Sequence, residues 1–326
     1  MKRIHRAAAV SLLALAASAA LAQAQAPAFP LKTVTLVVPY APGGLPDTVA
    51  RVVGQKLGDK WGHAVVVENK PGGNGVVSAQ YLATKPADGY TLLVTDGSMF
   101  SINPFIYKSL PYDPQKDFTF ISLAARAPLF LAVHPSLPAA NFTEFVQLVK
   151  AKPAQYTYGS SGIGSIHHLT FESIKAALGI ELLHVPFKGT GQSVPAVVSD
   201  QVTAVWSAIP SIAGFVKEGK LKLIAVNSEK RSALAPEIAT VAETTIPGFD
   251  FAPTIGFSAP AGMPAALAAK ISADVAEVLR DPALKERLQI LGIDAVGGSP
   301  QDYAAQVLAD RARYEKAVKL AGAKAD

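Results

Sequence analysis

The chain has 326 residues and no cysteine, which excludes disulfides, thiolate metal ligands, iron–sulfur clusters and a cysteine nucleophile. Its formal net charge is +5 at neutral pH, but its basic residues form no stripe of the kind that binds nucleic acid, so no nucleic-acid partner is expected. About 300 residues beyond the N-terminal segment usually make two domains, which here must be held by their cores alone.

The N-terminus has the three parts of a secretory signal peptide. Lys2, Arg3 and Arg6 form a basic head, and residues 7–22 are almost wholly apolar. Ala-x-Ala patterns then predict cleavage near residues 22–26. The alternative is a membrane anchor, but this run falls short of the roughly 20 residues that a bilayer requires. We therefore expect export to the periplasm, and removal of the head leaves a net charge of +2.

The first third of the remaining chain alternates short β-rich runs with helical patterns. Strands are expected at 34–38, 65–67 and 91–94, with helices at 47–61 and through Leu82. Glycine-rich turns join these elements. Strands that alternate with helices predict parallel sheets covered on both faces.

The same alternation restarts after a proline-rich middle. The strands expected there are 129–133, 156–159, 182–185, 202–206 and 221–226. The helices expected between them are 142–151, 167–178, 192–199 and 209–218. A strand at 255–258 and helices at 264–279 and 300–320 complete the chain. The pattern predicts an α/β fold of two doubly wound domains with a ligand cleft between them.

Two glycine-rich loops, 38–47 and 158–165, each follow a strand and lead into a helix. Ligands of open parallel sheets bind beyond the carboxyl ends of the strands. Amides at a helix N-terminus lack partners, and the helix dipole favours an anion there. Two such loops that face each other could hold a carboxylate without an arginine, although a loop of this kind can also be a purely structural turn.

The candidate donors are the amides and hydroxyls of these two loops: Gly43, Gly44, Leu45, Ser160, Ser161, Gly162, Gly164 and Ser165. Asp47 stands where a helix N-cap or first-turn acid belongs, and it either caps the helix or organises the ligand site.

A catalytic serine is the main alternative for the second loop. The nucleophile elbow requires Gly-x-Ser-x-Gly, and Tyr158 or Ile163 replaces a required glycine when the motif is centred on Ser160 or Ser161. No histidine has a triad context in the sequence. We therefore assign no catalytic residue.

Metal and cofactor motifs are also lacking. His167 and His168 are adjacent, so on a helix their side chains point about 100° apart, which does not suit a shared metal. No zinc spacing, Walker loop or dinucleotide fingerprint occurs, so neither a metal nor a cofactor is expected.

Several short motifs are spread in order along nearly the whole chain after the signal segment. They are 38–44 with Asp47, 67–75, 86–92, 110–114, 158–165, 185–189 and 259–264. In these motifs the chain resembles the extracytoplasmic solute-binding receptors of tripartite tricarboxylate transporters, often called the Bug family. The resemblance implies a monomeric bilobed periplasmic binding protein that closes on a small organic carboxylate and delivers it to membrane transporter subunits.

The resemblance also implies how the chain is divided. After a signal peptide over 1–26, residues 27–128 and 253–326 would form a discontinuous first domain, and 129–252 the second. The two crossovers, near 126–129 and 251–254, would act as the hinge. Segments 43–47 and 160–165 would hold one carboxylate through amides, hydroxyls and ordered waters.

The chain departs from the family pattern in the second domain. Phe187 replaces a tyrosine, and the stretch at 200–203 ends in Thr203 where the family often has aspartate. A less acidic second domain suits a second carboxylate or an aromatic ring. The other residues expected near the cleft are Tyr40, Ser98, Gly189, Thr190, Trp206 and Ser207. Trp206 could equally belong to the core.

These observations predict a receptor for an aromatic carboxylate or a dicarboxylate, with no enzymatic activity. Two alternatives remain open. One is a secreted serine hydrolase that uses Ser160 or Ser161. The other is a ligand sensor that presents its closed form to a membrane signalling protein.

Overall fold

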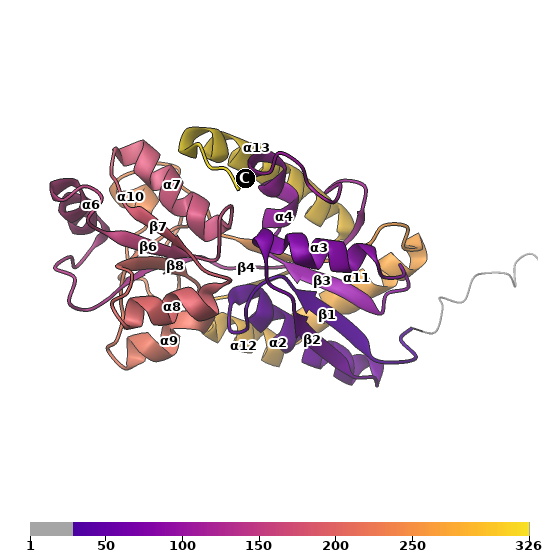
Figure 1. Ribbon diagram of the computed structural model, residues 1–326. Coiled ribbons are helices and arrows are strands. Elements are labelled where there is room, and N and C mark those ends of the chain that lie inside the picture. The colour runs from indigo at the N-terminus through magenta and orange to yellow at the C-terminus, as the bar shows by residue number, and fades with distance from the viewer. Residues whose placement is uncertain (1–28, 326) are drawn as a thin grey trace, which may run out of the picture.

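A computed structural model describes residues 29–325 and shows two lobes, each built on its own β-sheet (Figure 1). The predicted signal peptide lies outside the described residues. Within these residues, no helix has the length and apolar character that a bilayer span requires.

The first lobe has a six-stranded sheet in the order β11-β4-β10-β3-β1-β2. Its strands are β1 (Val34–Val38), β2 (Val65–Asn69), β3 (Thr91–Thr95), β4 (Phe118–Arg126), β10 (Thr254–Pro260) and β11 (Asp294–Gly298). Strand β1 pairs in parallel with β2 and β3, whereas β10 is antiparallel to both β3 and β4.

Helices cover both faces of this sheet, because its strands are apolar on both sides. One layer consists of α2 (Leu45–Trp61), α11 (Ala265–Arg280) and α12 (Pro282–Ile290). The other consists of η1 (Gly73–Gly75), α3 (Val76–Ala83), α4 (Ser98–Ser101), α5 (Asn103–Ile106) and α13 (Pro300–Ala321). Successive side chains of β1 point to opposite faces of the sheet, so Leu36 packs in the core under α2 and Val37 in the core under α3.

The second lobe has a five-stranded sheet in the order β7-β6-β8-β5-β9. Its strands are β5 (Phe130–Val133), β6 (Thr157–Ser160), β7 (Leu183–Pro186), β8 (Ala204–Ser207) and β9 (Lys222–Val226). Its helices are α6 (Phe142–Ala151), α7 (Ile166–Leu178), α8 (Thr190–Val198), α9 (Ile209–Lys217) and α10 (Val241–Thr244). Helices α6 and α7 lie over one face and α8 and α9 over the other (Figure 1).

The predicted two-lobed α/β architecture is confirmed, but the expectation of purely parallel sheets is wrong. Each sheet is mixed, because the strands that carry the chain between lobes run against their neighbours. The chain leaves the first lobe along β4 into β5 and returns from β9 into β10. Strand β4 and its partner β10 lie side by side and antiparallel.

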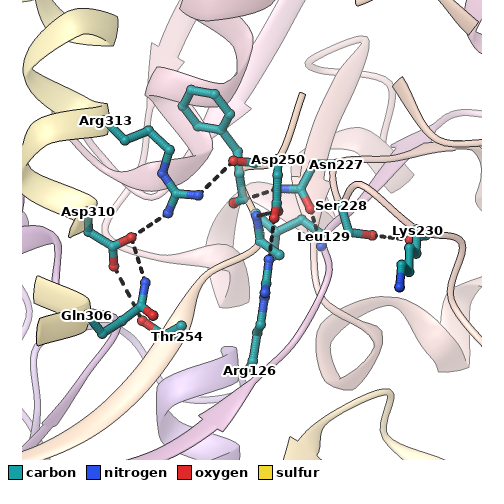
Figure 2. Close-up of polar contacts among 12 residues, drawn as sticks. Arg126, Leu129, Asn227, Ser228, Lys230, Asp250, Thr254, Gln306, Asp310 and Arg313 are labelled. Carbon is teal, nitrogen blue, oxygen red and sulfur yellow. Dashed lines mark hydrogen bonds and ion pairs between the residues drawn. The ribbon is translucent and has the colours of Figure 1, made fainter. Parts of the chain in front are cut away.

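The two crossovers between lobes are tied together by Asn227, which follows β9 (Figure 2). Its side-chain oxygen accepts the Leu129 N–H at 2.7 Å, and its side-chain nitrogen donates to the Phe251 carbonyl at 2.8 Å. The crossovers also bond to each other, from the Ala127 N–H to the Pro253 carbonyl at 3.1 Å. One buried side chain thus fixes both crossovers to the second lobe.

Charged side chains brace the same crossovers from the first lobe. Arg126 at the end of β4 pairs with Asp250, and Arg313 on α13 donates to the Asp250 carbonyl at 2.9 Å (Figure 2). Arg313 also pairs with Asp310, which lies one turn earlier on the helix. Helix α13 is therefore linked to the segment that brings the chain back from the second lobe.

Candidate functional site

A pocket of about 220 Å³ lies between the lobes, at the carboxyl ends of the parallel strands. The first lobe contributes residues that follow β1, β2 and α5, and the second contributes residues around the ends of β6 and β7. The lining residues are Pro39, Tyr40, Gly72, Gly73, Asn74, Tyr107, Ser161, Gly162, Ile163, Pro186, Phe187, Lys188 and Ala325. Ligands of open α/β sheets bind in this position.

A larger hollow of about 720 Å³ lies on the crossovers, and it is a weaker candidate. Its wall mixes both signs of charge, as Arg126, Lys230 and Arg231 alternate with Glu229 and Asp250. It lies away from the glycine-rich loops at the strand ends. The interlobe pocket is therefore the candidate functional site.

The lobes touch each other directly around this pocket. The Ala41 N–H donates to the Lys188 carbonyl at 3.1 Å, and the Asn74 side chain donates to the Gly164 carbonyl at 2.8 Å. The Ser211 hydroxyl donates to the Gly43 carbonyl at 2.7 Å. The structure therefore shows a closed arrangement of the lobes.

Two glycines permit this close approach. A Cβ at Gly164 would lie 1.9 Å from the Cδ1 of Ile106, and a Cβ at Gly191 would lie 2.2 Å from the Pro42 carbonyl oxygen. Real Cβ atoms do not come so close. At Gly164 the end of the Ile106 side chain would have to shift, whereas at Gly191 the obstacle is backbone, so a side chain there would push the lobes apart.

The first predicted loop is organised by Asp47. Its carboxylate accepts the Gly43 N–H at 2.9 Å, the Asn69 side chain at 2.9 Å and two bonds at 3.0 Å from Arg51. Burial opposes ionisation of Asp47, but these hydrogen bonds, led by those from Arg51, outweigh it and lower the pKa of the carboxyl. The helix N-cap is Gly44, and Asp47 is a first-turn acid that holds the loop in shape.

This arrangement changes what the first loop offers to a ligand. The Gly43 amide is occupied by Asp47, and Gly44 packs against Thr190 of the second lobe. The residues of this loop that line the pocket are Pro39 and Tyr40. The Gly43–Asp47 stretch lies outside it and forms part of the contact between lobes.

Tyr40 is held by a buried acid that the sequence did not single out. Its hydroxyl donates to Asp96 at 2.9 Å and lies 3.2 Å from the Asn74 side-chain oxygen. Asp96, just after β3, also accepts the Ser98 N–H at 3.0 Å. Burial raises the pKa of Asp96 and, helped by this acid, raises the pKa of Tyr40. Ser98 thus orients Asp96 and does not line the pocket.

Asn74 is the second site residue that sequence reasoning missed. It has a positive φ of 48°, which asparagine tolerates, in the glycine-rich turn after β2. Its side-chain nitrogen bonds Asn103 at 2.9 Å as well as the Gly164 carbonyl across the pocket. An asparagine inside a Gly-Gly-Asn-Gly turn at a strand end was the available signal.

In the second loop, most of the predicted donors are engaged within their own lobe. The Ser160 hydroxyl lies 2.6 Å from Nε2 of His184 and accepts the Gly162 N–H at 3.0 Å. The Ser165 side chain caps α7 by accepting the His168 N–H, and the Gly164 N–H donates to Nδ1 of His168. Of the predicted donors, Ser161 and Gly162 line the pocket, together with Ile163 of the same loop.

The remaining predicted site residues lie away from the pocket lining. Trp206 is fully buried on the α7 face of its sheet, 5.9 Å from the ring of Phe171. Ser207 is buried in the neighbouring position, and the Thr190 hydroxyl bonds Ser211 at 3.0 Å. Gly189 backs onto Ala41, and Leu45 is buried in the core. Of the aromatic candidates, Tyr40 and Phe187 line the pocket.

Burial keeps the histidines behind the second loop neutral. His168 and His184 stack at 4.2 Å, and desolvation lowers the pKa of His168 to about 4 and that of His184 to about 3. Among residues 29–325, no group of three or more histidine, aspartate or glutamate side chains is arranged to hold a metal ion. Among the described lining residues, the site offers hydrogen-bond donors and one basic residue, Lys188.

A protein-family model matches most of the chain. The model described as "Tripartite tricarboxylate transporter family receptor" matches residues 49–322. A protein in the gbd 5′ region of Cupriavidus necator is 34% identical over 98% of this chain and 96% of its own length.

Solved structures give the same result. A protein of R. palustris with adipate superposes with a TM-score of 0.87 at 33% identity, over 91% of this chain and 99% of that one. The periplasmic binding protein BugD gives 0.86 at 30% identity, over 91% and 99%. MatC from Rhodopseudomonas palustris with bound malate gives 0.82 at 31% identity, over 89% and 100%.

Proposed function

The chain belongs to the tripartite tricarboxylate transporter receptor family, also known through its Bug members, and we propose that it captures a small organic carboxylate in the interlobe pocket without altering it. The observation that carries this proposal is the composition of the pocket wall. Among the described lining residues there is no aspartate or glutamate, whereas Lys188, the Ser161 hydroxyl and glycine-loop backbone are present. Such a wall favours an anion over a cation.

The size and shape of the pocket refine the ligand class. A volume of about 220 Å³ lies below the roughly 300–1,000 Å³ of pockets for drug-sized ligands, which favours a small acid over a large one. Rings of Tyr40, Tyr107 and Phe187 line the wall. We propose an aromatic carboxylate or a dicarboxylate, and the relatives solved with adipate and malate support the dicarboxylate.

The family also supports a cellular role. We propose that the chain is exported to the periplasm, acts as a monomer and delivers its ligand to the membrane subunits of a tripartite tricarboxylate-type transporter. We further propose that residues 27–128 with 253–326 move as one domain and 129–252 as the other. The distribution of strands supports this division, since no strand of one sheet falls within the residues of the other domain.

A secreted hydrolase is the second candidate, because Ser160 and His184 form a contact that resembles a nucleophile with its base. Two features favour the receptor. Ser160 has no exposed surface, and a histidine whose pKa is about 3 is a poor general base at neutral pH.

A thermal-shift screen of the protein without its signal segment tests the proposal, with titration calorimetry for every positive compound. The panel pairs each carboxylate with its amide. We expect stabilisation by at least one carboxylate and none by its amide, since a ligand at a hundredfold excess over Kd adds about 2.7 kcal/mol to the free energy of unfolding. Lack of a shift across the panel would refute the carboxylate assignment, and an altered ligand recovered after incubation would favour the hydrolase.

A further inference from the structure

We infer that the segment after α13, residues 322–325, forms one wall of the ligand pocket and limits the length of ligand that the protein accepts. This inference rests on the proposed function, because it concerns selectivity in the same pocket. The observation behind it is that Ala325 lines the pocket, although every other lining residue precedes it in the sequence by more than 130 positions.

The chain reaches this position because α13 ends in a sharp turn. Gly322 adopts a left-handed φ of 58° as the C-cap, and its N–H donates to the Val318 carbonyl. The Ala323 N–H also reaches the Val318 carbonyl, at 3.3 Å. This paired closure of a helix end by glycine directs the following residues back across the helix. Figure 1 shows the yellow end of the chain between α7 and α4, beside the region where the lobes meet.

Two contacts hold the segment in place. Ala323 is buried in the core with Tyr314 and Val318 of α13. The Ala325 N–H donates to the Ile106 carbonyl at 2.9 Å, at the end of α5. The segment therefore belongs to the first lobe and is anchored beside the pocket by both its side chains and its backbone.

The same anchor point faces the second lobe. The side chain of Ile106 fills the space beside Gly164, where a Cβ would come within 1.9 Å. The neighbours of these two residues, Tyr107 and Ile163, both line the pocket with Ala325. Residue 325 thus lies beside Tyr107 of the first lobe and Ile163 of the second, on a side of the wall to which both lobes contribute.

The consequence is a length limit. The side chain at 325 is a single methyl group, and the wall behind it is fixed by a backbone bond. A longer side chain there would occupy pocket volume that a long ligand needs and a short ligand does not. A shorter ligand would still fit, because the glycine and serine loops that we assign to its carboxylate would be unchanged.

The test uses two variants and a control. Ala325→Leu adds bulk at the wall, and a chain that ends at Gly322 removes it. Lys324→Ala is the matched control, because this neighbouring side chain is exposed and does not line the pocket. Calorimetry measures Kd for succinate, adipate, suberate and terephthalate, and thermal unfolding checks that each variant folds.

We expect Ala325→Leu to raise the Kd of the longest ligand that the wild type binds by at least about tenfold relative to the Kd of the shortest. This is the range for a misfit of one methylene group in a pocket. The shortened chain should discriminate less between lengths, and Lys324→Ala should match the wild type. If Ala325→Leu keeps the wild-type ratio of Kd values, the wall inference is wrong while the receptor assignment stands. If the wild type binds none of the four acids, the proposed dicarboxylate function is wrong.

Discussion

The hydroxyl of Ser160 lies 2.6 Å from Nε2 of His184, and this contact supports the second glycine-rich loop from behind. The ring of His184 contacts the rings of both His168 and Tyr158, in a partly buried cluster behind the second loop. Ser160 in turn holds the Gly162 amide, which places Ser161 and Gly162 at the pocket. A hydrogen bond that resembles a catalytic dyad thus shapes a binding loop.

The buried histidines predict acid sensitivity. Burial lowers the pKa of His167 and His168 to about 4 and of His184 to about 3, whereas an unfolded histidine titrates near 6.5. Between pH 6.5 and about 4 the unfolded state therefore binds protons that the folded state does not, so the free energy of unfolding falls as the pH falls. We expect a slope of about 1 kcal/mol per pH unit or more, measured by urea unfolding at a series of pH values. His184→Gln, whose amide can still bond Ser160, should flatten the slope; an unchanged slope would contradict this account.

Asp47 should matter for stability and for binding, although it lies outside the pocket. Asp47→Asn keeps the shape but removes the charge that accepts bonds from Arg51, Asn69 and the Gly43 amide. Hydrogen bonds to a buried charged group are worth about 1.5–3 kcal/mol each, so we expect a loss of about 1–3 kcal/mol in urea unfolding, together with weaker ligand binding. Asp59→Asn, on the exposed side of the same helix, is the control and should change neither quantity. Equal effects of the two substitutions would show that Asp47 has no organising role.

The local elements were predictable because their signals are local. The strand at Val34–Val38 and the helix at Phe142–Ala151 have the bounds that hydrophobic periodicity gives. Strand β4 was missed. Its partner is distant in the sequence, since Arg126 pairs with Thr254, more than a hundred positions later. A short window shows strand-forming residues there, such as Phe118 and Phe120, but not that the strand pairs with the returning chain.

The site was harder to predict than the fold for a related reason. The glycine loops mark where a ligand could bind, but the groups left free there depend on long-range partners. Asp47 occupies the Gly43 amide, and His184 occupies the Ser160 hydroxyl. Trp206 is in the core because Phe171 of α7 covers its face of the sheet. Ala325 reaches the pocket through a turn at a helix end, which no motif announces.

Asn227 should be a main determinant of interlobe stability. Asn227→Ala leaves the Leu129 N–H and the Phe251 carbonyl without their side-chain partner in a buried setting, while the backbone of residue 227 still pairs with both segments (Figure 2). Each buried group left unsatisfied costs about 1–3 kcal/mol, so a loss of about 2 kcal/mol or more is expected in urea unfolding. Ser228→Ala removes only an exposed hydroxyl that bonds Lys230 and should cost under about 0.5 kcal/mol. If the two variants unfold at the same urea concentration, the crossovers do not depend on Asn227.

Gly191 offers the sharpest test of lobe closure, because it lies in the first turn of helix α8 and leaves no room for a side chain beside Pro42 of the opposite lobe. Gly191→Ala places a better helix former than glycine in the first turn of α8, so the second lobe should not be weakened. The new Cβ would stand 2.2 Å from the Pro42 carbonyl of the first lobe, which prevents the observed closed contact. We therefore expect a ligand affinity at least about tenfold lower with an unchanged or higher unfolding temperature, since the ligand binds the closed form.

Gly214→Ala is the matched control in helix α9, where an added Cβ meets open space, and it should bind as the wild type does. A Gly191→Ala protein with wild-type affinity would mean that ligand capture does not require this contact between the lobes.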